Sequence, residues 1–195
     1  MTQAYSGIPV AQRLASGSVA WPCFRAWPAP FPVPSELEVL GDPSCLNGSM
    51  IGFLCSRRAP GAVVIAVHDW ARAARDAGAA VISGFQSPLE RDVLRFLLRG
   101  SQPIVVCPAR DIGRYRVPAE WREPLGKGRL TVVSPFGAKD RRITARLASE
   151  RNRFVAAVAE TLIIAHATSG GALAAVADEM RAWGKEARAL TEECA

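Results

Sequence analysis

The chain has 195 residues, of which 49% are hydrophobic and 22% are charged, a composition typical of one soluble globular domain. No apolar run approaches the roughly 18 residues that span a bilayer, and the interrupted N-terminal stretch is unlike a secretory signal peptide. The five cysteines are widely spaced, which favours reduced thiols in the cytoplasm over disulfides or structural zinc: Cys23, Cys45, Cys55, Cys107 and Cys194.

The net charge of +6 is unevenly distributed along the chain. Residues 57–153 carry 19 Lys and Arg against 9 Asp and Glu, whereas residues 1–56 and 154–195 are both slightly acidic. A basic middle segment indicates a polyanionic partner. A general bias toward arginine, which supplies 21 of the 24 basic residues, explains the same excess without a partner.

Residues 1–44 are unusually rich in proline and tryptophan. Trp-Pro occurs at 21–22 and at 27–28, and Pro30, Pro32 and Pro34 follow. Proline at this density disfavours helices and central strands. We therefore expect an extended arm, anchored by its tryptophans on a domain formed by residues 45–195. A proline segment that binds a partner is the alternative.

From residue 50 onward, apolar runs of strand length alternate with helical patterns. Strands are expected within 50–56, 79–85, 102–108, 128–136, 160–167 and 186–191, and helices over 62–77, 87–100, 142–158 and 171–183. The helix at 87–100 has the clearest start, because Ser87 and Glu90 have the spacing of a capping box. The alternation predicts an α/β fold, a Rossmann-like, doubly wound, mostly parallel sheet with helices on both faces.

In a doubly wound sheet, ligands bind beyond the carboxyl ends of the strands. The residues expected there are Ser56, Arg57, Arg58, Ser83, Gly84, Phe85, Arg110, Ser169, Gly170 and Gly171, and the helix before the fifth strand adds Arg151, Asn152 and Arg153. Backbone N–H groups at helix starts bind anions, and arginine binds phosphate bidentately. The pattern predicts a phosphate-binding pocket at this edge.

Each of these residues has an expected role. Arg57, Arg151 and Arg153 are expected to be exposed and to hold phosphates. Asn152 is expected to orient the loops, and Phe85 to stack on a base. Hydroxyl and backbone contacts are expected from the small residues Ser56, Gly84, Ser169, Gly170 and Gly171.

Three stretches resemble the Rossmann-like domain of the DNA-processing protein A family (DprA, also called Smf): IGFLCSRRAPG, VISGFQSP and SERNRFVAAVAETLIIAHATSGG. The resemblance covers roughly residues 50–190. It implies a positive pocket that holds single-stranded DNA in a cytoplasmic, DNA-processing protein that is not itself an enzyme. The sequence departs from the family where Ser83-Gly84 continues as Phe85-Gln86-Ser87 instead of Arg-Gly-Ile-Asp.

A nucleotide-binding sensor, or a hydrolase related to the LOG-type nucleotide phosphoribohydrolases of the same superfamily, is the alternative function. These hydrolases carry Pro-Gly-Gly-x-Gly-Thr-x-x-Glu, and here Ala177 stands at the glutamate position. Glu90 is the one acid expected near the edge, and its capping role accounts for it. His68 and His166 lack a third ligand in pattern, so we expect no metal, no cofactor and no catalytic residue. The expected partner is single-stranded DNA or a nucleotide, and a homodimer is compatible with the sequence.

Overall fold

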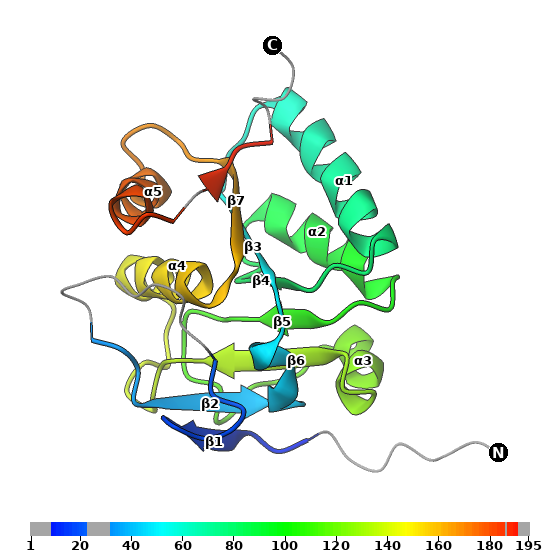
Figure 1. Cartoon of the computed structure of the whole chain (residues 1–195), viewed down its shortest axis with the longest axis vertical. Coiled ribbons are helices and arrows are strands. Elements are labelled where there is room, and N and C mark those ends of the chain that lie inside the picture. The colour runs from blue at the N-terminus through cyan, green and yellow to red at the C-terminus, as the bar shows by residue number, and fades with distance from the viewer. Residues whose placement is uncertain (1–8, 23–31, 186, 191–195) are drawn as a thin grey trace.

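The computed structural model describes residues 9–22, 32–185 and 187–190, and within them eight strands form one sheet (Figure 1). The strand order is β1-β2-β6-β5-β4-β3-β7-β8. Six strands run parallel: β3 (Ile51–Cys55), β4 (Val81–Ser83), β5 (Ile104–Val106), β6 (Leu130–Ser134), β7 (Thr161–His166) and β8 (Ala187–Arg188). The prediction of a mostly parallel α/β sheet is confirmed.

Helices cover both faces of the sheet (Figure 1). Helices α1 (Gly61–Asp76) and α2 (Pro88–Leu98) pack on one face, and α4 (Ala145–Val158) and α5 (Ala172–Ala182) pack on the other. Successive strand residues point to opposite faces, so Phe53 belongs to the first core and its neighbour Leu54 to the second. Shorter elements are η1 (Pro43–Asn47), η2 (Ala119–Trp121) and α3 (Arg122–Gly126), which were not predicted.

The order of the parallel strands reverses between β3 and β7, which makes that position the topological switch point. In doubly wound folds the carboxyl ends of the strands beside this point are the usual ligand site. The loops after β3 and β7 carry residues 56–60 and 167–171, as the sequence predicted.

The segment 1–44, predicted to be an extended arm, contributes two strands to the sheet. Strand β2 (Glu36–Leu40) pairs antiparallel with β6, and β1 (Gln12–Ala15) pairs antiparallel with β2. The prolines lie outside both strands, so they leave the ladder intact, and Leu37 and Val39 are fully buried. Trp21 packs against the core on the α4 side, as an anchor would, whereas Trp27 lies outside the described residues.

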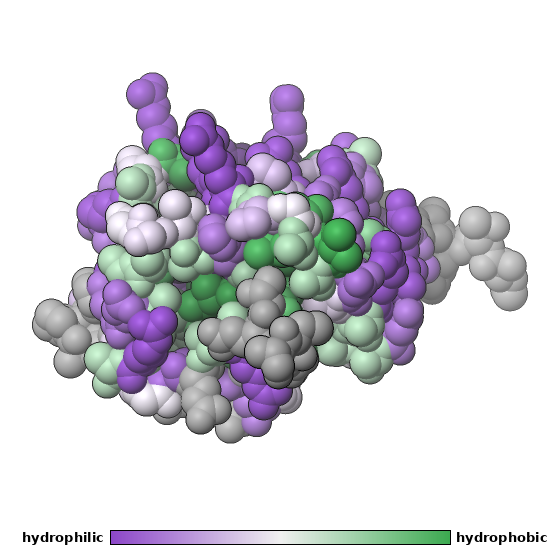
Figure 2. All heavy atoms as spheres, turned by 90° about the horizontal axis from the view of Figure 1, so that it is seen from above, coloured by the Kyte–Doolittle hydropathy of each residue, from purple (hydrophilic) through white to green (hydrophobic). Residues whose placement is uncertain are grey.

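The described cysteines are structural. Cys55 and Cys107 are buried in the core, where removal from water raises the pKa of each thiol to about 12. Neither these two nor the half-buried Cys45 is in a disulfide. Among the described residues no three His, Cys, Asp or Glu side chains gather as metal ligands, and no helix is long and apolar enough to cross a membrane. The face seen in Figure 2 is largely hydrophilic, with smaller apolar patches between the polar side chains.

The predicted capping box at the start of α2 is confirmed. Ser87 Oγ accepts a hydrogen bond from Glu90 N at 3.2 Å, and Glu90 Oε2 accepts one from Ser87 N at 3.1 Å. The same carboxylate also accepts from Gln86 N at 2.8 Å and from Cys55 N at 3.2 Å, and the residue is only 3% exposed. Glu90 therefore ties the end of β3 to the start of α2.

We predict that Glu90→Gln lowers the free energy of unfolding by about 2 kcal/mol, because three buried backbone amides lose their charged acceptor. Urea unfolding followed by circular dichroism measures the change. The matched control is Glu123→Gln, an exposed residue on α3, which should change stability by less than about 1 kcal/mol. Equal effects of the two substitutions would contradict this role of Glu90.

Candidate functional site

The loops after β3 and β7 are joined at the switch point by Ser56. Its backbone N–H donates to the carbonyl of His166 at 2.9 Å, and its Oγ accepts from Thr168 N at 3.1 Å. The two polar ends that the sequence placed together therefore do meet at one edge of the sheet. Ser56 is half-buried and serves first as the link between these loops.

Arg151 is buried against Gly84, which the sequence did not predict. The guanidinium occupies the space above the glycine, so that a Cβ added at Gly84 would overlap it. Arg151 Nη1 donates to the carbonyl of Cys107 at 3.2 Å, Nε donates to Asn152 Oδ1 at 2.8 Å, and the residue is 4% exposed. The expectation that Arg151 is exposed is therefore wrong: its side chain joins α4 to the ends of β4 and β5.

The turn beneath Arg151 is buried as well. Phe85 has φ 49°, a backbone conformation that bulky side chains rarely adopt, and its N–H donates to Ser83 Oγ at 3.2 Å. Its ring lies in the core on the α1 side and is 6% exposed, so the expectation that it stacks on a base is not supported by its position. The strained turn is held by core packing on one side and by Arg151 on the other.

Arg153 is engaged in an ion pair between helices. Its Nε and Nη2 donate to the two carboxylate oxygens of Glu179 on α5, at 2.5 and 2.7 Å. The expectation that Arg153 is exposed is wrong too, since its side chain is only 14% exposed. The hydrogen bond from Arg153 is the main reason that the pKa of Glu179 lies below its usual value. Asn152, between the two arginines, is half-buried and accepts the Arg151 hydrogen bond.

The accessible part of the predicted site lies on the loops. Arg57, Arg58, Ser169 and Gly170 are exposed. Gly171 caps α5 with no side-chain hydrogen bond, so the first N–H groups of that helix have no side-chain acceptor at the cap. An uncapped helix start beside two exposed arginines is suited to an anion.

Sequence reasoning missed most of the exposed cations at this edge. The loops after the five strands β3 to β7 comprise residues 56–60, 84–87, 107–118, 135–144 and 167–171, and together they hold eight basic residues and two acidic ones. Beyond Arg57, Arg58 and Arg110, the basic residues are Arg114, Arg116, Lys139, Arg141 and Arg142, all exposed. Arg110 is half-buried, with its guanidinium 5.1 Å from the centre of the Tyr115 ring. A search for cations after every predicted strand would have found all of them.

The two acids on these loops have local partners. Asp111 Oδ1 accepts from Gly113 N at 3.0 Å, and this hydrogen bond is the largest cause of its lowered pKa. Asp140 lies 3.4 Å from Arg146 on α4. Their charges are thus used within the loops, and the exposed cations dominate the rim.

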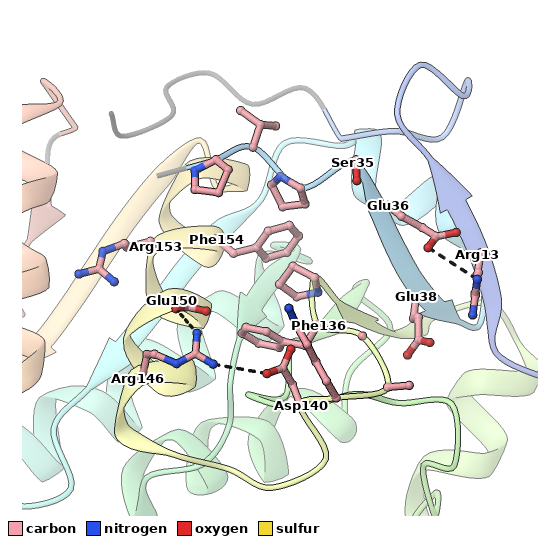
Figure 3. Close-up of a pocket in the computed structure, with 17 residues that line it drawn as sticks. Arg13, Ser35, Glu36, Glu38, Phe136, Asp140, Arg146, Glu150, Arg153 and Phe154 are labelled. Atoms are coloured by element: carbon pink, nitrogen blue, oxygen red, sulfur yellow. Dashed lines mark hydrogen bonds and ion pairs between the residues drawn. The ribbon is translucent and has the colours of Figure 1, made fainter. Parts of the chain in front are cut away.

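A pocket of about 600 Å³ lies on the α4 side of the same edge (Figure 3). Its walls are the segment 32–36, the loop 135–140 and the face of α4. Of the predicted site residues only Arg153 lines it. The sequence placed the pocket at the switch point instead, because the contribution of residues 32–38 to this edge was not foreseen.

We predict that Gly84→Ala and Arg151→Ala each destabilise the protein, by about 1–3 kcal/mol for the clash and about 2–4 kcal/mol for the lost hydrogen bonds. The double variant should be less destabilised than the sum, because alanine at 84 fits the space that the guanidinium leaves. Chemical denaturation of the four proteins measures this coupling. Gly137→Ala is the control, since its Cβ meets nothing within 4 Å. Strict additivity would refute the contact.

We predict that the Arg153–Glu179 pair contributes at most about 1 kcal/mol, because both groups are partly exposed. Since the pKa of Glu179 is lowered on folding, this stabilisation is present above the unfolded pKa and is lost as the pH falls through the folded pKa. The difference in Tm between wild type and Glu179→Gln should therefore be seen at pH 7 and disappear toward pH 3. Glu120→Gln, without an ion pair in the described part of the chain, should show no such difference. A Glu179→Gln difference that does not vary with pH would rule out the pair.

Comparison with known proteins agrees with this fold and sequence. A profile of the family described as DNA recombination-mediator protein A matches residues 31–186. DNA processing protein A from Helicobacter pylori, a protein that binds single-stranded DNA, has a similar structure, with a TM-score of 0.68 and 17% identity over 91% of this chain and 79% of that one.

DNA processing protein A from Streptococcus pneumoniae is also similar, with a TM-score of 0.71 and 13% identity over 94% of this chain and 62% of that one. At these identities the two structures support the likeness of fold alone. No sequence match among curated proteins reaches significance. Because the profile spans most of the chain, from before β2 to beyond β7, the protein belongs to the DNA recombination-mediator protein A family, the DprA family that its motifs resemble.

Proposed function

We propose that the protein binds single-stranded DNA along the carboxyl edge of its sheet. The observation that carries the proposal is the charge of the five loops at this edge, with eight basic residues against two acidic ones. The Helicobacter pylori relative binds single-stranded DNA and has the same fold. Polyanions bind such a rim by releasing condensed counterions, whatever their sequence.

The accessible residues hold the phosphates, and the buried ones hold the edge in shape. Arg57 and Arg58 lie beside the uncapped start of α5, where Ser169, Gly170 and Gly171 offer hydroxyl and backbone groups. The loops after β5 and β6 continue the row of cations from Arg110 to Arg142. Arg151, Gly84 and Ser83 fix the turn between these two groups and do not reach the strand themselves.

The geometry favours a strand over a mononucleotide. The basic loops extend from β7 to β6, which is four strand spacings, or about 19 Å. A mononucleotide would contact one or two loops, whereas an extended strand contacts most of them. The cations therefore match a chain of phosphates.

Binding without hydrolysis is favoured by the position of the acids. The carboxylate of Glu90 is buried and accepts three backbone hydrogen bonds, so it has no free oxygen directed toward a ribosyl bond. Ala177, at the position of the hydrolase glutamate, is buried on α5. We also place the protein in the cytoplasm, in agreement with the unpaired thiols of Cys45, Cys55 and Cys107.

We predict that the affinity for an oligothymidine strand falls with salt with a log–log slope of roughly −2 to −3, since each phosphate contact on a single strand contributes about −0.7. The double variants Arg57→Gln/Arg58→Gln and Arg141→Gln/Arg142→Gln should each weaken binding and make the slope less steep by about 1. Fluorescence anisotropy at several salt concentrations measures both quantities.

The control is Arg99→Gln/Lys127→Gln, which removes two exposed positive charges at the opposite edge of the sheet and should leave the slope unchanged. If all three variants lose affinity equally, only the net charge matters and the site is not at this edge. A flat salt response, with a mononucleotide bound more tightly than any oligomer, would replace the DNA proposal with nucleotide sensing.

A further inference from the structure

The pocket beside the basic rim differs in chemistry from the rim itself. It has a volume of about 600 Å³, within the range of small-molecule sites. We infer that this pocket receives one base of the bound strand, while the neighbouring loops hold its phosphates. The inference rests on the proposed function and adds a subsite to it.

The floor of the pocket is apolar. Figure 3 shows the rings of Phe136 and Phe154 beneath the segment that carries Pro32 to Pro34. Phe136 packs on Leu147 of α4 and on Ala109, and so its ring is held in a fixed position. A flat apolar floor of this kind suits the face of an aromatic heterocycle.

The walls of the pocket carry balanced charge. Four basic and four acidic residues line it: Arg13, Lys139, Arg146 and Arg153, with Glu36, Glu38, Asp140 and Glu150. Most of them are paired. Arg146 lies 2.6 Å from Glu150 and 3.4 Å from Asp140, and Arg13 lies 3.9 Å from Glu36.

This balance selects against phosphate and favours a neutral ligand. A phosphate would have to compete with carboxylates for each paired cation. An uncharged base instead meets both donors and acceptors, because the guanidinium groups have N–H to give and the carboxylates have free lone pairs. The pocket and the rim therefore divide the two parts of a nucleotide between them.

The two sites share one loop. Residues 135–140 line the pocket, and the loop continues through Arg141 and Arg142, which are exposed. Lys139 belongs to both. A phosphate held by this loop leaves its own base within reach of the pocket mouth.

The test compares two strands of equal charge: an oligothymidine, and the same length of deoxyribose phosphate without bases. The wild-type protein should bind the oligothymidine at least about fivefold more tightly, the lower end of one base–aromatic contact. The salt slopes of the two strands should be equal, because the phosphates are the same.

Two variants locate this preference. Phe136→Leu keeps the apolar volume and removes the aromatic ring, and Phe96→Leu on α2 makes the same change far from the pocket as its control. Gly137→Trp adds an indole to the pocket wall at a position where a Cβ meets nothing within 4 Å, so it remains usable if Phe136→Leu is unstable. The preference for bases should disappear in both pocket variants and persist in the control.

Each other outcome overturns a defined statement. Equal wild-type affinity for the two strands excludes the base subsite and leaves the binding of DNA at the rim intact. A preference that persists in both pocket variants places the base elsewhere and also excludes this subsite. If the wild-type protein binds neither strand, the proposed function fails together with the subsite.

Discussion

The packing of a buried guanidinium on a glycine holds the functional edge of this protein together. Arg151 reaches from α4 across the sheet edge, covers Gly84 and donates to the carbonyl of Cys107. The contact needs a residue without a side chain at 84, and it leaves Phe85 in a strained conformation directly after it. Because β4, β5 and α4 meet only through this contact at their ends, the positions of the flanking loops depend on it.

This arrangement divides the edge into a buried frame and an exposed rim. The frame consists of Ser83, Gly84, Phe85 and Arg151, together with Glu90 at the start of α2. The rim consists of the arginines and the lysine on the loops after β3, β5 and β6. A ligand with many phosphates meets only the rim, so residues from the most family-like motifs act on it through the shape they impose.

The antiparallel strands β1 and β2 extend the sheet beyond β6 and give the edge its pocket. They bring residues 32–38 against α4 and the loop after β6, which no parallel strand of the core could do. The result is a neutral, partly apolar site directly beside a basic one. A chain molecule that alternates charged phosphates with flat bases has the same two chemistries.

The sequence by itself determined the order of strands and helices, the parallel sheet, the capping box of Ser87 and Glu90, and the edge at which the loops gather. These follow from local periodicity and capping, which depend on neighbours within a few residues. Only the tertiary structure decided which arginines reach solvent. Arg151 and Arg153 belong to the same helix, and their burial depends on Gly84 and Glu179, which are 67 and 26 residues away along the chain. Likewise, the alternation of prolines in residues 1–44 hid β2, because its place beside β6 is fixed by a partner about 90 residues distant. Charge and hydropathy patterns record neighbours in sequence, whereas exposure is set by neighbours in space.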